Sequence, residues 1–407
     1  MRALLPRLGA DFAKLWTASA VSNLGDGVTM VAGPLLVASI TTDPAAVAAA
    51  AFAQQLPWLL FALISGAWAD RLDRRRLVVV VNLIRAAALG ALFTAVASGT
   101  VTSWLVYAVF FVLGTGETLA DTASAAFVPS IVPNDRLPTA NAWLGVTFTV
   151  LNQFAAKPLG AWLFVVAAAV PFGVNALSFA AAAALVAGIR IPRADPLPPS
   201  SLREDIAAGV SWLWRHRLLR TLAVTMAFGN LVFCAAFAIF VLYSRDRLGL
   251  SDVGYGVLLT AFAIGGLLGT LLAPRLLQLV NATVLLRAGL LVEVALHATL
   301  AATTVPWVAG AMIVVFGVHT MVWGVVVVTI RQRAVPPSMF GRVTSVYSLL
   351  DLGGAALGSL LGGAVAQAYG IVATFWTAAA AMVVVTAAAW GPLRTAKAQF
   401  RIRAATS

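Results

Sequence analysis

Residues 66–76 read GAWADRLDRRR and lie between two long apolar runs. These eleven residues hold two aspartates and four arginines, although only 10% of the whole chain is charged and 61% is hydrophobic. The neighbouring runs are long enough to cross a hydrocarbon core, which needs about 20 apolar residues in a helix. The stretch therefore predicts a polar loop between two membrane spans.

The composition excludes a water-soluble protein. A soluble chain carries about 25% charged residues, whereas this chain of 407 residues carries 10% and has a mean hydropathy of +0.94. Lipid cannot satisfy free backbone groups, so apolar runs in a membrane form helices or barrel strands. Because the runs are unbroken and do not alternate every second residue, they predict helices. We expect an all-α membrane protein.

The apolar runs predict twelve transmembrane helices, separated by turn-forming and charged clusters. The first run is too long for a cleaved signal peptide and contains Asp26, so we expect it to be retained as a span. The expected spans are 14–38, 47–69, 77–97, 103–127, 139–168, 171–189, 219–243, 254–273, 283–302, 307–330, 342–368 and 371–393.

The basic residues predict the orientation of the spans, because arginine and lysine in short loops stay on the cytoplasmic side. Only Arg245 and Arg247 fall in expected external loops, and Lys157 alone is placed within a span. Both termini are therefore expected in the cytoplasm. The expected cytoplasmic connections carry Arg71, Arg74, Arg75, Arg76, Arg136, the stretch 190–220, Arg275, Arg331, Arg333 and Arg342.

A polar segment divides the spans into two sets of six. The residues after Arg190 read IPRADPLPPS, which cannot be helical throughout. Ser201 and Glu204 then match an S-x-x-E capping box, which predicts an amphipathic interfacial helix. Repeated six-span halves are typical of secondary transporters. We expect an N-terminal six-helix bundle over 1–190, a cytoplasmic linker over 191–218 and a C-terminal six-helix bundle over 219–407.

The chain resembles the major facilitator superfamily, whose signature between helices two and three is G-x-x-x-D-R-x-G-R-R. Asp73 stands where that family usually has glycine, and aspartate adopts a left-handed turn less readily than glycine. The stretches SNLGDGVTMVAGPLLV, PSIVP and REDIAAGVSWLWRHRLLR are similar to the drug-exporter branch, which includes the enterobactin exporter and macrolide efflux proteins. The resemblance implies two pseudo-symmetric six-helix bundles. The residues that match the signature are Gly66, Asp70, Arg71, Arg74 and Arg75.

The resemblance gives the opening stretch a role as a conformational gate. It implies that Gly66 lets helix two pack closely on helix eleven, and that Asp70 faces the amino-terminal end of helix eleven. The partial positive charge of a helix N-terminus attracts a carboxylate, so this latch is expected to hold the cytoplasmic side shut. The arginines are expected to set the topology and to pair with carboxylates across the gate.

Four acidic residues within the spans are candidates for proton coupling or for binding substrate charge. A charged side chain in a membrane needs a partner, a water-filled cavity or a function. The glycines on either side of Asp26 are expected to leave room around it, and the resemblance implies that its span lines a central cavity. The four candidates are Asp26, Glu117, Asp121 and Asp351.

Glu117 and Asp121 lie one turn apart on the same face of the fourth span. Asp121 is closer to the cytoplasm, so it is a candidate partner of Arg71 or Arg75 in the gate. Glu117 has two interpretations. It either takes part in proton coupling or forms a neutralising bridge to Lys157 with no role in the transport cycle.

Further polar and aromatic side chains are candidates for lining the cavity, because aromatic rings offer flat apolar surface to an amphipathic substrate. Glu293 and His297 lie one turn apart on the ninth span, which is peripheral in the resembled fold. We expect these two to form a structural hydrogen-bonded pair. The candidate lining residues are Asn23, Lys157, Phe233, Phe237, His319 and Trp323.

The sequence also excludes several classes of function. It contains no G-x-x-x-x-G-K-[ST] phosphate loop, so ATP is not the direct energy source, and no Ser-His-Asp or HExxH pattern suggests an enzyme. The net charge of +12 is scattered over loops, as the positive-inside rule and anionic headgroups explain, so nucleic acid is not an expected partner. Cys234 is the single cysteine, so no disulfide or cysteine metal site is expected. We expect no catalytic residue, cofactor or metal.

We therefore expect a monomeric proton-coupled transporter in the inner (plasma) membrane of a bacterium, with lipid around it, that exports amphipathic, cationic small molecules. An ionised Asp26 or Glu117 attracts the cation, and a proton from the acidic outside releases it. One alternative is export of a native metabolite such as a siderophore or antibiotic, since Lys157 and His319 would suit an anion. Another is a transport-silent membrane scaffold or sensor.

Overall fold

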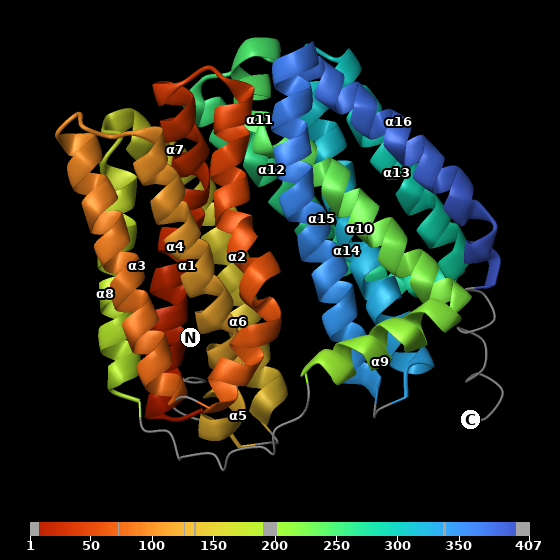
Figure 1. Cartoon of the computed structure of the whole chain (residues 1–407), viewed down its shortest axis with the longest axis horizontal. Helices are drawn as coiled ribbons and strands as arrows, with labels where there is room; N and C mark the ends of the chain where they lie inside the picture. The colour runs from red at the N-terminus through yellow and green to blue at the C-terminus, as the bar shows by residue number, and fades with distance from the viewer. Residues whose placement is uncertain are drawn as a thin grey trace. The chain divides into compact units, whose positions relative to one another are not determined.

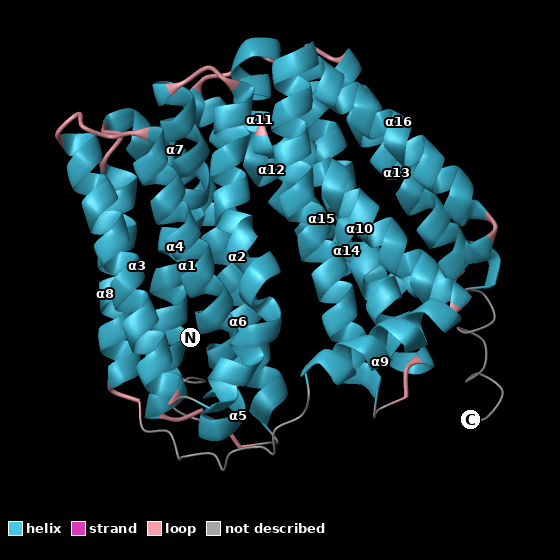
Figure 2. Ribbon diagram, viewed as in Figure 1, coloured by secondary structure: helices cyan, strands magenta, loops and turns pink. Residues whose placement is uncertain are grey.

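The computed structural model describes residues 8–71, 73–125, 127–133, 136–189, 202–336 and 339–395. Within these residues, Figure 2 shows helices joined by loops and turns, with no strand. Eleven helices in this part of the chain are long and apolar enough to cross a membrane. The prediction of an all-α membrane protein is confirmed.

The first half of the chain forms long helices whose ends match the expected spans to within a few residues. The exception is the expected span 139–168, which is divided among three elements. The helices are α1 (Ala10–Ile40), α2 (Pro44–Arg71), α3 (Arg74–Ala97), α4 (Ser103–Ala125), α5 (Phe127–Ile131), α6 (Leu137–Thr147), η3 (Phe148–Ala155), α7 (Ala156–Val166) and α8 (Val170–Ala187).

The second half begins with α9 (Leu202–Arg215), the helix that the capping box predicts. Six long helices follow it, and they agree with the six remaining expected spans. The elements are α10 (Arg217–Ala238), α11 (Phe240–Leu242), η4 (Tyr243–Arg247), α12 (Asp252–Leu279), α13 (Ala282–Ala302), α14 (Pro306–Ala334), α15 (Phe340–Tyr369), α16 (Ile371–Trp390) and η6 (Pro392–Thr395).

The fifth expected span is irregular because η3 is a π-helix of eight residues. A π-helix has a wider turn than an α-helix, is rare, and often occurs at functional sites. The sequence does not mark this change, since FTVLNQFA is an ordinary apolar helical stretch with two amides. The wide turn carries Asn152 and Gln153, which both reach the cavity described below.

The chain divides into two compact units. The first, here called the N-terminal bundle, comprises Met1–Thr42, Ala49–Pro199 and Ser251–Thr260. The second, here called the C-terminal bundle, comprises Asp43–Ala48, Ser200–Leu250 and Ala261–Ser407.

The C-terminal bundle is built around the close contact of α10 with α15, which run side by side in Figure 1. Gly354, Gly358 and Gly362 recur every fourth residue and therefore lie on one face of α15. A Cβ atom at any of them would collide with a backbone carbonyl of α10. Small residues at this spacing let two membrane helices approach closely. The contact holds the α10 and α15 side chains that line the cavity of this bundle.

Candidate functional site

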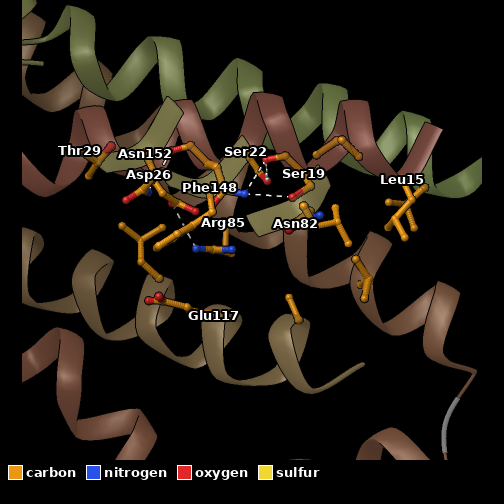
Figure 3. A pocket seen from close by; sticks show the side chains of 18 of the residues that line it. Leu15, Ser19, Ser22, Asp26, Thr29, Asn82, Arg85, Glu117, Phe148 and Asn152 are labelled. Atoms are coloured by element: carbon orange, nitrogen blue, oxygen red, sulfur yellow. Dashed lines mark hydrogen bonds and ion pairs between the residues drawn. The ribbon is translucent and has the colours of Figure 1, made fainter. Parts of the chain in front are cut away.

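The N-terminal bundle contains a cavity of about 550 Å³, within the range of about 300–1,000 Å³ that pockets for small ligands occupy. Its polar side chains come from α1, α2, α3, α4, α6 and η3, and Figure 3 shows the wall around Asp26. Nine amide and hydroxyl side chains stand beside three charged ones, and two of the nine are Gln54 of α2 and Asn141 of α6. The polar lining residues of α1, α3, α4 and η3 are Ser19, Ser22, Asn23, Asp26, Thr29, Asn82, Arg85, Glu117, Asn152 and Gln153.

Asp26 and Arg85 form an ion pair in the wall of this cavity. Arg85 Nη2 lies 3.3 Å from Asp26 Oδ1 (Figure 3). The Arg85 side chain is 7% exposed, whereas the Asp26 side chain is 34% exposed. The guanidinium carbon of Arg85 also lies 3.8 Å from the centroid of the Phe179 ring, which adds a cation–π contact. The pair thus neutralises a buried arginine while the carboxylate stays accessible from the cavity.

The role of Arg85 corrects the expectation that Lys157 alone is a basic residue within a span. Arg85 lies in the middle of α3, and a Cβ at Gly116 of α4 would collide with its stem, so the glycine leaves room for it. Arg287 lies within α13, donates to the Trp390 carbonyl and places its guanidinium carbon 4.5 Å from the Trp390 ring centroid. The signal that should have identified Arg85 is its position in an apolar run, where an arginine requires a partner.

The sequence suggested that the glycines beside Asp26 leave open space around it. In the structure they instead allow neighbouring helices to pack closely. A Cβ at Gly25 would collide with the side chains of Asn175 and Ser178 on α8. A Cβ at Gly27 would collide with Ala156 and with the backbone of η3. The two glycines therefore let α1 approach both neighbours, and this approach fixes the direction of Asp26.

Polar side chains connect α1 to η3 and α7. Lys157 Nζ donates to Gln153 Oε1 at 2.7 Å, Gln153 Nε2 donates to Asn152 Oδ1 at 3.1 Å, and Asn152 Nδ2 donates to the Asn23 carbonyl at 3.0 Å. Lys157 is buried and contacts the lining residue Gln153 without belonging to the lining itself. Glu117 lines the cavity (Figure 3), whereas the side chain of Asp121 lies outside the described part of the structure.

The signature stretch is described only in part. Gly66, Asp70 and Arg71 lie in α2, but their side chains are outside the described part of the chain, so the latch stays a prediction. Arg74 begins α3. Arg75 Nη1 lies 3.3 Å from the Ala187 carbonyl and 3.1 Å from the Ile189 carbonyl, at the C-terminal end of α8. An arginine in this place satisfies carbonyls that the helix leaves unpaired.

Asp73 does not adopt the left-handed conformation that the family's glycine suggested. Its φ is −62° and its ψ is 105°, and it is the N-cap of α3. Its Oδ1 accepts a hydrogen bond of 3.1 Å from the backbone N–H of Arg76. Aspartate is a favoured N-cap residue because it satisfies one of the free N–H groups at the start of a helix. The substitution of glycine by aspartate therefore has a local structural reason.

The C-terminal bundle contains a smaller cavity of about 290 Å³ with a largely aromatic wall. The Phe233 ring centroid lies 5.2 Å from that of Phe316 and 6.2 Å from that of Phe262. Phe237 stacks on Phe233 at 5.5 Å but does not belong to the lining. The aromatic and polar lining residues are Phe233, Phe262, Phe316, Trp323, Thr225, Asn230, Glu293, His319, Thr320 and Asp351.

Glu293 pairs with His319 and not, as the helical spacing suggested, with the side chain of His297. Its Oε1 lies 3.4 Å from His319 Nε2 of α14. His297 Nδ1 instead lies 2.9 Å from the backbone carbonyl of Glu293. The ninth span, α13, thus turns its carboxylate toward the cavity, and the expectation of a purely structural Glu293–His297 pair is wrong.

Asp351 also reaches this cavity, from α15. Asn230 Nδ2 on α10 donates to the Asp351 backbone carbonyl at 2.9 Å, and Cys234 Sγ lies 3.5 Å from Asn230 Oδ1. Among the described residues, no group of three or more His, Cys, Asp or Glu side chains is arranged to hold a metal ion. Each cavity thus presents carboxylate side chains: Asp26 and Glu117 in the N-terminal bundle, Glu293 and Asp351 in the C-terminal bundle.

Comparison with known proteins agrees with this architecture. The model of the family described as transmembrane secretion effector matches residues 3–402. Multidrug efflux pump Tap of Mycolicibacterium fortuitum is 26% identical over 373 residues, which cover 88% of this chain and 90% of that protein. Macrolide efflux protein A of Streptococcus pyogenes is 26% identical over 270 residues, which cover 64% of this chain and 65% of that protein.

Solved structures show the same fold. The crystal structure of the nucleoside transporter NupG aligns with a TM-score of 0.74 at 13% identity, and the alignment covers 97% of this chain and 100% of that one. The family match across nearly the whole chain and the bacterial efflux relatives place the protein among multi-span transporters of the bacterial inner membrane. The chain belongs to the transmembrane secretion effector family of the major facilitator superfamily.

Proposed function

We propose that this transporter exports amphipathic, cationic small molecules in exchange for protons. The names of its relatives as efflux pumps support export. The observation that carries proton exchange is the Asp26–Arg85 pair in the wall of a cavity of about 550 Å³. A carboxylate that is paired on one side and open to a cavity on the other can exchange protons and ligand cations without leaving its place.

Protonation of Asp26 changes the charge of the whole pair. With Asp26 ionised, the pair is neutral and Glu117 adds a negative charge to the same cavity. When Asp26 takes a proton, Arg85 keeps its positive charge without a counter-ion, and a bound cation is repelled. A proton that enters from the acidic outside therefore releases the cation there, and loss of the proton to the cytoplasm restores the site. Alternating access of the cavity to the two sides completes the cycle.

The structure weakens the case for an anionic native metabolite. That alternative depended on positive charge at Lys157 and His319. Lys157 donates to Gln153 at 2.7 Å, and His319 lies 3.4 Å from the Glu293 carboxylate. Both groups are thus engaged by acceptors of the protein itself, and we retain the cation as the substrate.

Transport in membrane vesicles tests the proposal. Vesicles that carry the full chain and an imposed proton gradient are expected to expel cationic dyes, and Asp26→Asn is expected to abolish dye-dependent proton movement. Asp11→Asn is the matched control, because Asp11 lies on the same helix and pairs with Lys14 at 3.0 Å outside the cavity. Proton movement in Asp26→Asn equal to that in Asp11→Asn contradicts the proposal.

We also propose that both termini face the cytoplasm and that the monomer is the working unit, with the bundles 1–190 and 219–407 joined by the linker 191–218. Cysteines introduced near either end, in a Cys234→Ala background, are expected to react with a membrane-impermeant reagent only in inverted vesicles. Labelling from the outside of intact cells contradicts this orientation.

A further inference from the structure

The pair formed by Glu293 and His319 is almost withdrawn from solvent. Their side chains are 13% and 8% exposed, and Glu293 Oε1 lies 3.4 Å from His319 Nε2. The second oxygen of Glu293, Oε2, is buried and has no hydrogen-bond partner among the described residues. A buried acceptor without a partner is costly, and a buried unpaired charge more so. The pair is therefore suited to hold a proton, which neutralises the carboxylate.

His319 provides a route for that proton. An imidazole accepts or gives a proton in the physiological range of pH, and its Nε2 faces the carboxylate. Transfer between Glu293 Oε1 and His319 Nε2 breaks one bond to hydrogen and forms another, with no other covalent change. One exchangeable proton can therefore belong to the pair as a whole, as is usual for strongly interacting groups.

The charges around the pair favour a cation over an anion. The titratable residues that line the cavity are Glu293 of α13, His319 of α14 and Asp351 of α15. The other packed helices contribute Thr225 and Asn230 from α10, Phe262 from α12 and Met382 from α16. No lysine or arginine belongs to this lining, all of which lies in the described part of the chain. Loss of the shared proton thus leaves a negative cavity.

The aromatic wall of the cavity favours a flat cation. The rings of Phe233 and Phe316 stack with an interplanar angle of 24°, and Trp323 lies edge-on to His319 with a centroid separation of 5.6 Å. A planar aromatic cation gains stacking and cation–π contacts on such a wall. The stacked rings stand in the same lining as the Glu293 carboxylate.

We propose that the cavity of the C-terminal bundle is a second exchange site, in which a planar aromatic cation takes the place of the proton shared by Glu293 and His319. This inference rests on the proposed function, in which cations are exchanged for protons, but it concerns a different cavity and a different carboxylate. It gives this bundle a binding role of its own.

Ethidium binding to the purified full-length protein tests the inference, because ethidium is planar, aromatic and positively charged at every pH used. Its fluorescence is titrated between about pH 5 and pH 8, where histidine titrates. The wild-type affinity is expected to fall as the pH falls, by up to about tenfold per pH unit when one proton competes with one cation. Glu293→Gln is expected to weaken binding at least about tenfold at the alkaline end and to remove this pH dependence.

Matched variants make every outcome decisive. Asp351→Asn removes another carboxylate from the same cavity and is expected to keep the pH dependence. Asp11→Asn, which lies outside both cavities, is expected to keep ethidium binding and its pH dependence. The inference is overturned if the wild type binds no ethidium, if Glu293→Gln binds as the wild type does, or if Asp351→Asn alone removes the pH dependence. Unimpaired transport by Asp26→Asn overturns the proposed function and leaves the ethidium result standing.

Size-exclusion chromatography and thermal unfolding report whether Glu293→Gln is folded. His319→Gln is a second variant that tests the inference if Glu293→Gln misfolds. It leaves the carboxylate but removes the group that shares the proton, so the pH dependence is expected to shift and ethidium binding to persist at the alkaline end. A pH dependence identical to that of the wild type overturns the inference.

Discussion

Each of the two cavities holds a carboxylate inside a membrane protein, but the two carboxylates face different partners. In the N-terminal bundle, Asp26 faces a permanent cation, Arg85, among amide and hydroxyl side chains. In the C-terminal bundle, Glu293 faces a titratable group, His319, among aromatic rings. An arginine stays charged at any physiological pH, whereas a histidine does not.

Burial alone therefore does not determine how a carboxylate responds to protonation, because the charge of its partner also matters. The Asp26 pair carries a fixed positive charge that becomes uncompensated when the carboxylate is protonated. In the exchange proposed above, the Glu293 pair becomes neutral through the proton that it holds. We therefore expect the first pair to be sensitive to removal of one partner, and the second to be sensitive to pH and to changes in the aromatic wall.

The largest expected effect comes from breaking the fixed pair. Arg85→Met keeps an apolar stem in the space beside Gly116 but leaves Asp26 without its cation. Removing one partner of a buried ion pair costs about 3–5 kcal/mol, and the partial exposure of Asp26 places the expected loss at the lower end of this range. Thermal and denaturant unfolding of the purified protein measure it.

The double variant Asp26→Asn/Arg85→Met provides the control for this prediction. It replaces both charges, so most of the lost stability is expected to return while coupled transport does not. If the double variant is as unstable as Arg85→Met, the packing of the arginine stem, and not its charge, holds the bundle.

The helices could be predicted from the sequence because apolar length and loop charge fix them before any packing is known. It was harder to predict which side of each helix faces which neighbouring helix. Helical spacing placed Glu293 next to His297, but only the packing of α13 against α14 shows that the carboxylate turns to His319. Arg85 lies 59 residues from its partner, so no local pattern joins them. The π-helix η3 packs closely against α1 at Gly27, a contact that a single stretch of sequence does not record.

The second prediction tests the glycine face that supports the aromatic cavity. Gly358→Ala places a methyl group against the Leu231 carbonyl of α10, so α10 and α15 must separate. Overpacking of this kind costs about 1–3 kcal/mol, measured as a lower unfolding temperature. Gly90→Ala on α3 is the matched control, because nothing lies within 4 Å of a Cβ at that position. Equal unfolding temperatures for the two variants would show that the contact yields without cost.

The third prediction separates the two cavities by their affinity for aromatic cations. Phe233→Leu preserves an apolar side chain but removes the ring that stacks on Phe316 at 5.2 Å. Aromatic pairs contribute about 0.5–1.5 kcal/mol beyond their buried area, so ethidium affinity is expected to fall about two- to tenfold. Phe148→Leu makes the same change in the polar cavity, where Phe148 is part of the lining. A larger loss of affinity in Phe148→Leu would place the aromatic cation in the N-terminal bundle.

The smallest expected effect concerns Asp73, an acid outside both cavities. Asp73 stabilises only the start of α3, whereas Asp26 and Glu293 are proposed to bind ligand cations. Its carboxylate caps α3, so Asp73→Ala is expected to cost about 1 kcal/mol, and Asp73→Gly, which restores the residue usual in the superfamily, only a few tenths. Its ion pair with Arg76, at 3.8 Å with the Arg76 side chain 80% exposed, adds little. Asp73→Asn keeps a capping oxygen without the charge and is therefore expected to unfold like the wild type. Unfolding measurements on the three variants decide the matter, because equal losses in Asp73→Asn and Asp73→Ala would assign the stabilisation to charge and not to the cap.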